Sequence, residues 1–320
     1  MGRILLACVV SLCLYIVAFA WVLDRPLTLG ALRDRIDASL RLGQSIQQPK
    51  LVILAGSNGP YSHRCETIEP RVGRPCINAG AAVGVGLDYL FARWKPLLHP
   101  GDIVYLPMEE AQYVRLRATT ELGPDAAIML RHDRTTLSLL PLRRQIAALF
   151  ACGPRDAIMS LIEVSLDANG FHDPRTMATG GTNLWGDHIG HTALLAGFNR
   201  ASLLAITPYH PTGAQIAAGY GTLLIGDFIQ WAGLHGVRVI GGLSTGFADS
   251  PIGDTGLDAI RAIYRGNTTG FLELANHSRY PRTAFFDTQD HLNEDGQISH
   301  SILVAEGLNQ LTDRTPAPSR

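Results

Sequence analysis

The sequence predicts an α/β fold: a three-layer α/β/α sandwich around a parallel sheet. Short apolar runs at residues 51–54, 102–106, 202–207 and 237–240 meet Gly- or Pro-containing loops, which is typical of buried strands. Helical patterns cover residues 85–98, 213–235 and 296–311. Apolar strands that alternate with helices indicate a parallel sheet covered on both faces.

The chain begins with an apolar segment, and residues 4–23 carry no charge. This length suits a helix that crosses a bilayer. Residues 1–23 are either a retained signal-anchor or a signal peptide cleaved after Ala20, where Ala18 and Ala20 give a small-x-small pattern. We favour the anchor, because the apolar run continues past Ala20. Either alternative places the rest of the chain outside the cytoplasm.

Three further regions surround or interrupt the predicted strands. Residues 24–50 are predicted as a stalk or leading helix, ahead of a globular domain at 51–312. Within that domain, residues 108–200 show helical patterns but no convincing strand, so we expect a helical insertion that shapes a cleft or docks a partner. Residues 313–320 are predicted to be a disordered tail.

The net charge argues against general nucleic-acid binding, and the cysteines leave one possible disulfide undecided. The formal net charge is -1, which gives no general electrostatic case for binding nucleic acid. Cys65 and Cys76 lie eleven residues apart and can pair in an oxidising compartment, but their spacing alone does not decide whether they do. Cys152 is expected in the core.

Ser57 is the first candidate for chemistry. It follows the apolar run 51–54 and lies between Gly56 and Asn58. Ligands bind at the carboxyl ends of strands in open α/β sheets, and a serine there can present its hydroxyl beside backbone N–H groups that stabilise an oxyanion. An ordinary turn between a strand and a helix has the same composition, so Ser57 needs a base elsewhere in the chain.

The second candidate segment is residues 285–296, where two phenylalanines lead into acidic residues and His291. A serine hydroxyl becomes a good nucleophile when a base removes its proton and an acid fixes the tautomer of that base. This segment supplies both kinds of group. A solvated helix-capping loop is the alternative, since Asp and Asn favour such positions.

Five blocks of the chain together resemble the SGNH (GDSL-like) superfamily of serine hydrolases and acyltransferases. The resemblance is greater to an exported bacterial subgroup that is often associated with cell-surface polysaccharide genes. In chain order, the blocks are Ala-Gly-Ser-Asn at 55–58, Asn-Ala-Gly at 78–80, a strand and acidic loop at 101–113, Asn-Leu-Trp-Gly-Asp at 183–187, and residues 285–296. The resemblance spans about residues 51–311 and implies the three-layer SGNH/flavodoxin-like sandwich.

The resemblance implies roles for individual residues. Ser57 is expected to be the nucleophile and His291 the base, with Asp287 as the acid and Asp290 as the alternative acid. The acid three residues before the histidine in the superfamily is replaced here by Thr288.

The same resemblance implies an oxyanion hole and a substrate cleft. The superfamily's Gly-x-Asn-Asp block is absent, which leaves Gly80 and either Asn183 or a group near Glu109 as oxyanion candidates. The residues expected to line the cleft are Asn58, Asp187 and Tyr113.

No cofactor or metal is expected. His188 and His191 lie three residues apart but have no strong third ligand nearby. The glycines at 80, 84 and 86 do not have the spacing of a dinucleotide-binding fingerprint.

The resemblance therefore predicts serine-dependent acyl chemistry through an acyl-enzyme, as an O-acetyltransferase or acetylesterase. The expected substrate is an exported polysaccharide or another acylated glycan. The protein is expected in the bacterial inner membrane with its globular domain in the periplasm, or secreted if the leader is cleaved, with a membrane acyl-donor protein as a further partner. The alternative is a non-catalytic SGNH-fold scaffold in a polysaccharide modification or export complex.

Overall fold

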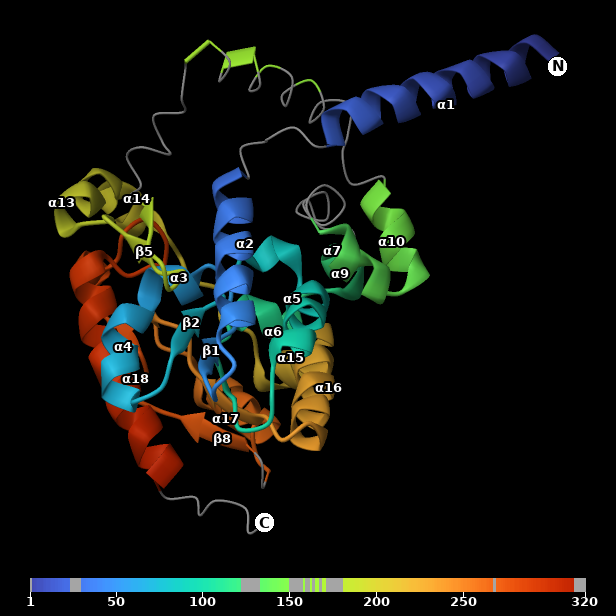
Figure 1. Ribbon diagram of the computed structural model, residues 1–320. Coiled ribbons are helices and arrows are strands. Elements are labelled where there is room, and N and C mark those ends of the chain that lie inside the picture. Colours follow the sequence, from blue (N-terminus) through green and yellow to red (C-terminus); the bar gives the residue numbers. More distant parts are fainter. Residues whose placement is uncertain are drawn as a thin grey trace.

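The computed structural model describes residues 2–23, 30–121, 133–149, 181–266 and 269–313, with a few isolated positions between 158 and 170. The fold is α/β, as predicted, and a five-stranded parallel sheet lies at its centre (Figure 1). The strand order is β2 (Cys76–Asn78), β1 (Leu51–Ile53), β3 (Ile103–Leu106), β6 (Arg238–Gly242) and β8 (Thr269–Leu272). The predicted strands at 51–54, 102–106 and 237–240 are confirmed.

Helices cover both faces of this sheet, an arrangement compatible with three layers. Side chains alternate along β1 and β3, so that neighbouring residues enter different hydrophobic clusters. One cluster is completed by α5 (Leu87–Trp94), α16 (Tyr220–Leu234) and α17 (Asp254–Ile263), and the other by α4 (Cys65–Val72) and α18 (Glu294–Asp313).

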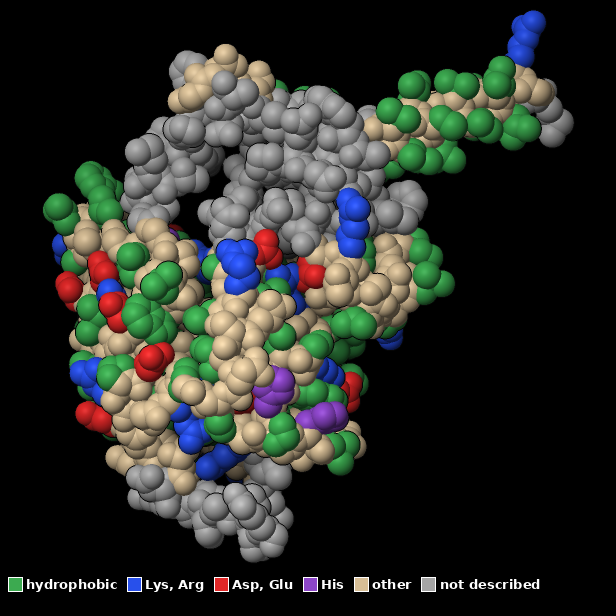
Figure 2. Space-filling view, in the orientation of Figure 1, with side chains coloured by type: hydrophobic (Ala, Val, Ile, Leu, Met, Phe, Trp, Pro, Cys, Tyr) green, Lys and Arg blue, Asp and Glu red, His purple; other side chains and the backbone are tan. Residues whose placement is uncertain are grey.

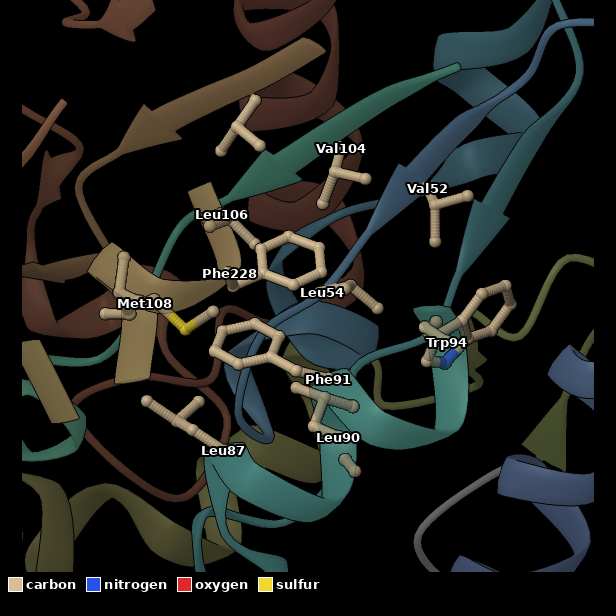
Figure 3. Close-up of a cluster of buried hydrophobic side chains, with 14 of the residues drawn as sticks. Val52, Leu54, Leu87, Leu90, Phe91, Trp94, Val104, Leu106, Met108 and Phe228 are labelled. Atoms are coloured by element: carbon tan, nitrogen blue, oxygen red, sulfur yellow. The ribbon is translucent and has the colours of Figure 1, made fainter. Parts of the chain in front are cut away.

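The larger cluster shows how strand and helix side chains meet. In Figure 3, Val52 and Val104 extend from the strands toward Phe91, Trp94 and neighbouring residues of α5. Phe91 also stacks on Phe228 of α16, with ring centroids 4.3 Å apart. Burial of these apolar side chains on both faces is the main stabilising contribution to a parallel sheet.

The predicted strand at 202–207 is wrong, because these residues fall largely in the helix α14 (Arg200–Ala205). Leu203 is buried against Phe247 and Phe285, whereas Leu204 is 64% exposed. A central strand would be buried on both faces, so this run suits a short helix with one buried side. Periodicity cannot separate these two possibilities in so short a run.

Other boundaries also differ from the predictions. The helical pattern at 213–235 forms two helices, α15 (Gly213–Ala217) and α16, and the pattern at 85–98 forms α5 flanked by 3-10 turns. The closing helix is confirmed as α18. Strands β2 and β8 were not predicted, because β2 has only three residues and β8 begins with Thr and Gly.

The region before the sheet contains two helices. Helix α2 (Gly30–Ser45) packs against the domain: Ile36 is buried, and Gly43 lies so close to Trp94 that an added Cβ would be 2.9 Å from its ring. Helix α1 (Gly2–Leu23) covers the apolar leader, and Figure 2 shows hydrophobic side chains around it. The side chains of residues 18–23 lie outside those described. Within the described part of the chain, no helix has both the length and the apolarity that crossing a membrane requires.

The predicted insertion at 108–200 is mostly helical where it is described. Its elements are α6 (Glu110–Val114), α7 (Arg117–Glu121), α9 (Arg134–Leu139), α10 (Leu142–Leu149), the antiparallel pair β4 (Gly181–Thr182) and β5 (His188–Ile189), and α13 (Ala193–Ala196). Cys152 and most of the predicted tail lie outside the described residues. Cys65 and Cys76 form a disulfide that joins the start of α4 to β2.

Candidate active site

Ser57 and Glu109 meet at the carboxyl ends of two neighbouring strands. In the β1–β3 pair, Ile53 is opposite Tyr105, and each candidate side chain comes four residues later, beyond the end of its strand. The chain runs from β1 to β2 on one side and then returns to β3 on the other, so these two strand ends flank the topological switch point of the sheet. The Ser57 hydroxyl donates a hydrogen bond to Glu109 Oε1 at 3.2 Å.

Glu109 is a buried carboxyl group held by the short helix α3 (Asn58–Ser62). The Asn58 N–H also donates to Glu109 Oε1, at 3.1 Å. Gly56 makes this approach possible, because a Cβ there would lie 2.3 Å from the same oxygen. Burial raises the pKa of Glu109, while the Asn58 N–H, the nearby His291 and the Ser57 hydroxyl oppose that shift.

His291 is paired with Asp287. Its Nδ1 lies 2.7 Å from Asp287 Oδ1, on a loop fixed by the backbone bond from Phe286 N–H to the His291 carbonyl at 2.8 Å. A carboxylate only accepts hydrogen bonds, so this contact places the proton on Nδ1 and leaves the Nε2 lone pair available as a base. Of the two predicted acids, the structure therefore pairs Asp287 with the histidine.

Tyr61 places His291 beside the start of α3. The two rings stack with centroids 4.1 Å apart and an interplanar angle of 10°. Tyr61 lies one turn after Ser57, and its N–H donates to the Ser57 carbonyl at 3.3 Å. Residues four apart share a helix face, so Ser57 and the Tyr61 ring, on which His291 stacks, lie on the same side of α3.

The other face of Tyr61 carries a basic group. His188 lies against it with ring centroids 4.1 Å apart, and Arg35 of α2 donates to His188 Nδ1 at 3.3 Å. The Arg35 guanidinium also lies 5.8 Å from the centre of the Tyr61 ring. The leading helix therefore contributes a cation to this side of the site.

Gly80 lies directly against the loop that carries Ser57. A Cβ at Gly80 would lie 2.8 Å from the Gly56 carbonyl oxygen and 2.9 Å from Gly59 Cα. The Gly80 N–H points to Asn78 Oδ1 at 3.4 Å. The close packing of the 56–60 loop on this residue explains why glycine is needed there.

Two other predicted site residues have structural partners. The Asp187 carboxylate is fully buried and accepts from the Cys65 and Glu66 N–H groups at 2.8 and 3.2 Å, which satisfies the start of α4. It also accepts from the side-chain amides of Asn78 and Asn183, both at 3.0 Å. These contacts commit Asn183 to a turn with Asp187.

Three more predicted residues also lie in the packed interior or near it. Tyr113 is fully buried, and its hydroxyl lies 3.2 Å from that of Tyr264. The Asn58 side chain donates to the Pro107 carbonyl at 2.7 Å, which ties α3 to the end of β3. Burial and the nearby Glu109 raise the pKa of Asp290 well above its ordinary value.

A buried pair of histidines supports the nucleophile loop from behind. His63 Nδ1 lies 3.3 Å from the Asn58 carbonyl, and its Nε2 lies 3.3 Å from His300 Nε2. Tyr280 completes the chain through its hydroxyl, 2.8 Å from His300 Nδ1. Burial lowers the pKa of His63 to about 4 and that of His300 well below its ordinary value, so both rings are neutral at pH 7.

Sequence reasoning did not identify the contact between Glu109 and Ser57, nor the roles of Tyr61, Arg35 and His63. The acidic loop after β3 was a usable signal for Glu109. The aromatic and basic contacts had no sequence signal, because they join residues from distant elements. Among the residues that the structure describes, no group of three or more His, Cys, Asp or Glu side chains could hold a metal ion.

Comparison of the chain with protein-family models, with curated proteins and with solved structures finds no match.

Proposed function

We propose that this protein performs serine-dependent acyl transfer or ester hydrolysis on an exported polysaccharide, as an O-acetyltransferase or acetylesterase. The observation that carries this proposal is the His291–Asp287 pair, stacked on Tyr61 one helical turn from Ser57. A nucleophile, a base and an orienting acid on one side of a switch point form the set of groups that acyl transfer needs.

In this mechanism Ser57 Oγ attacks the carbonyl carbon of an acyl ester, and its proton passes to His291 Nε2. The ester C–O bond then breaks, and the proton moves from His291 to the leaving oxygen, which gives acyl-Ser57 and a free alcohol. Water or a sugar hydroxyl then attacks the acyl carbon while His291 takes its proton, and the proton returns to Ser57 Oγ as the acyl–serine bond breaks. Asp287 stabilises the imidazolium that forms in each half-reaction.

Glu109 has a specific place in this cycle. Its Oε1 lies 3.2 Å from the Ser57 hydroxyl oxygen and 3.1 Å from the Asn58 nitrogen. A substrate carbonyl oxygen would bind at this position. We therefore treat the observed contact as the resting state, from which the Glu109 side chain moves aside when substrate enters. The second oxyanion donor of the proposal is the Gly80 N–H on the adjoining loop, which must leave its 3.4 Å contact with Asn78 Oδ1 to bind the oxyanion.

The finer features of the proposal concern fold type and location. The sheet belongs to a three-layer sandwich of the SGNH type, and the apolar helix α1 tethers it to the inner membrane with the domain in the periplasm. The exposed apolar side chains of α1, such as Ile4 at 71% and Leu5 at 69%, support insertion into a lipid phase. An acylated glycan and a membrane acyl-donor protein are the proposed partners.

A non-catalytic scaffold is the second candidate, and one observation favours it. Glu109 accepts from both the Ser57 hydroxyl and the Asn58 N–H, two groups that catalysis requires. A carboxylate that never left this position would block the site and keep the fold as a binding platform.

The test is a burst experiment on the full-length protein with p-nitrophenyl acetate, followed by peptide mapping. The proposal predicts a burst accompanied by an acetyl group on the Ser57 peptide, and that acetyl group is absent in Ser57→Ala. Ser299→Ala is the matched control, because Ser299 is exposed and its hydroxyl donates only to a helix carbonyl, that of Asp295 at 2.9 Å. A folded protein that shows no acetyl on Ser57 would favour the scaffold.

A further inference from the structure

A second serine has a complete hydrogen-bonded relay, away from the residues of the proposed site. Ser250 Oγ lies 3.0 Å from His210 Nε2, and His210 Nδ1 lies 2.7 Å from Glu110 Oε2. The three residues come from separate parts of the chain: the start of α6, the loop before α15, and the loop after β7 (Gly246–Phe247). The order of atoms is the one that activates a serine nucleophile: acid oxygen, Nδ1, Nε2, serine oxygen.

Glu110 also forms an ion pair with a second partner, Arg279. Arg279 Nη2 donates to Glu110 Oε1 at 2.9 Å, and its Nη1 donates to the Ser244 carbonyl at 2.9 Å. Gly246 leaves room for this arginine, since a Cβ there would lie 2.4 Å from Nη1. An ion-paired carboxylate accepts hydrogen bonds only, so it draws the proton of His210 to Nδ1.

This tautomer determines the last step of the relay. With its proton on Nδ1, His210 presents a lone pair at Nε2, and Ser250 must donate its own hydroxyl proton to it. His210 is 23% exposed in its side chain and Ser250 is half-buried, whereas Glu110 is 10% exposed. The acid is therefore largely screened from water, whereas the serine and its histidine are partly exposed.

The neighbouring residues Glu109 and Glu110 serve different serines. The side chain of Glu109 bonds to Ser57, and that of Glu110 bonds to His210 and Arg279. The N-terminus of α6 thus separates two serine-containing sites that share no side chain.

We propose that Ser250 is a second nucleophilic serine, with His210 as its base and Glu110 as the acid that orients the base, and that it accepts acyl groups from small activated esters. Ser250 Oγ bonds to the carbonyl carbon while its proton passes to His210 Nε2. The ester C–O bond breaks, and this proton leaves with the alcohol. Attack by water then releases the acid and restores the hydroxyl. This inference is independent of the proposed function, which uses Ser57 and His291.

The experiment is active-site labelling of the full-length protein with an alkyl fluorophosphonate, followed by peptide mapping that quantifies each serine separately. In this reaction the serine oxygen bonds to phosphorus, fluoride leaves, and the histidine takes the proton. We expect labelling of the Ser250 peptide in the wild type and in Ser57→Ala. We expect a fall of about a hundredfold or more in His210→Asn, which keeps a donor toward Glu110 but lacks Nε2.

The exposed Ser299 is the internal reference for a serine without a histidine. Wild-type labelling of Ser250 no faster than that of Ser299 would overturn the proposal without reliance on any variant. Equal labelling of Ser250 in folded His210→Asn would also overturn it and leave the relay as a link between two loops. A label on Ser57 with none on Ser250 would refute only this inference, and a label on Ser250 with none on Ser57 would refute only the proposed function.

Discussion

Replacing Glu109 with glutamine and, separately, His291 with asparagine tests which side chain removes the proton of Ser57. Glu109 is the observed partner of the hydroxyl, at 3.2 Å, whereas His291 has the orienting acid. Our mechanism makes His291 the base. Loss of a general base lowers rates by about 10² to 10⁴, or about 3 to 5 kcal/mol of barrier.

The expected effect of Glu109→Gln is much smaller. A glutamine keeps an acceptor oxygen for the Ser57 hydroxyl and the Asn58 N–H, so only the difference between a charged and a neutral acceptor is lost. That difference is about 1 kcal/mol per hydrogen bond, so the rate should change by about tenfold or less, and it should rise, because the weaker resting contact with Ser57 has to break before substrate binds. The assay is the rate of acetylation of the Ser57 peptide at pH 7. A loss of a hundredfold in Glu109→Gln with little loss in His291→Asn would refute the assignment and make Glu109 the base.

The pH dependence of the free energy of unfolding of Glu109→Gln tests whether the Glu109 carboxyl group is buried in the folded protein. Burial raises its pKa above the ordinary 4.5, so the folded state binds this proton more tightly than the unfolded state. The stability that this group contributes is complete below pH 4.5 and is lost as pH rises through the folded pKa. Urea unfolding should therefore show a smaller decline in stability as pH rises above 4.5 in Glu109→Gln than in the wild type; equal declines would contradict the buried environment.

Three further predictions concern the framework around the site. Replacing both Cys65 and Cys76 with serine removes the disulfide that joins these two residues, 11 positions apart. The free energy of unfolding, measured in urea, should fall by about 3 kcal/mol. An unchanged midpoint would contradict a stabilising role. Asp187→Ala should cost about 3 kcal/mol or more, because it removes the acceptor of the buried Cys65 N–H, of the Glu66 N–H and of the Asn183 amide. Thermal unfolding at the wild-type temperature would argue against this. Burial lowers the pKa of His63 from 6.5 to about 4, so protonation of the unfolded chain should lower the free energy of unfolding by about 3 kcal/mol as pH falls from 6.5 to 4. In urea unfolding, His63→Gln should lose less stability over that range than the wild type. An equal loss would contradict the assignment.

The parts of the fold that could be predicted are those with local signals. The runs that became β1, β3 and β6 are continuous, apolar and bounded by turn residues, so their burial on both faces is visible in the sequence. The run at 202–207 has the same local appearance, but only Leu203 is buried. Which apolar runs enter the sheet depends on long-range packing, which no local pattern records.

In the site, too, some residues have local sequence signals whereas others depend on long-range packing. Ser57 and His291 lie in motifs that indicate their chemistry, and Asp287 lies one short loop from its histidine. The contact between Ser57 and Glu109 depends on the in-register pairing of β1 with β3, which the sequence alone does not provide. The relay of Ser250, His210 and Glu110 has no motif at all, because its members are 40 and 100 residues apart.

The most direct test of the account is to stop the reaction with p-nitrophenyl acetate by acid within the burst and to map the acetylated peptides. The account predicts an acetyl ester on Ser57 in the wild type, greatly reduced in His291→Asn and absent from Ser57→Ala. An acetyl group that forms on Ser57 equally fast without the His291 imidazole, or a folded wild type that carries none on Ser57, would contradict the claim that this serine is the activated nucleophile.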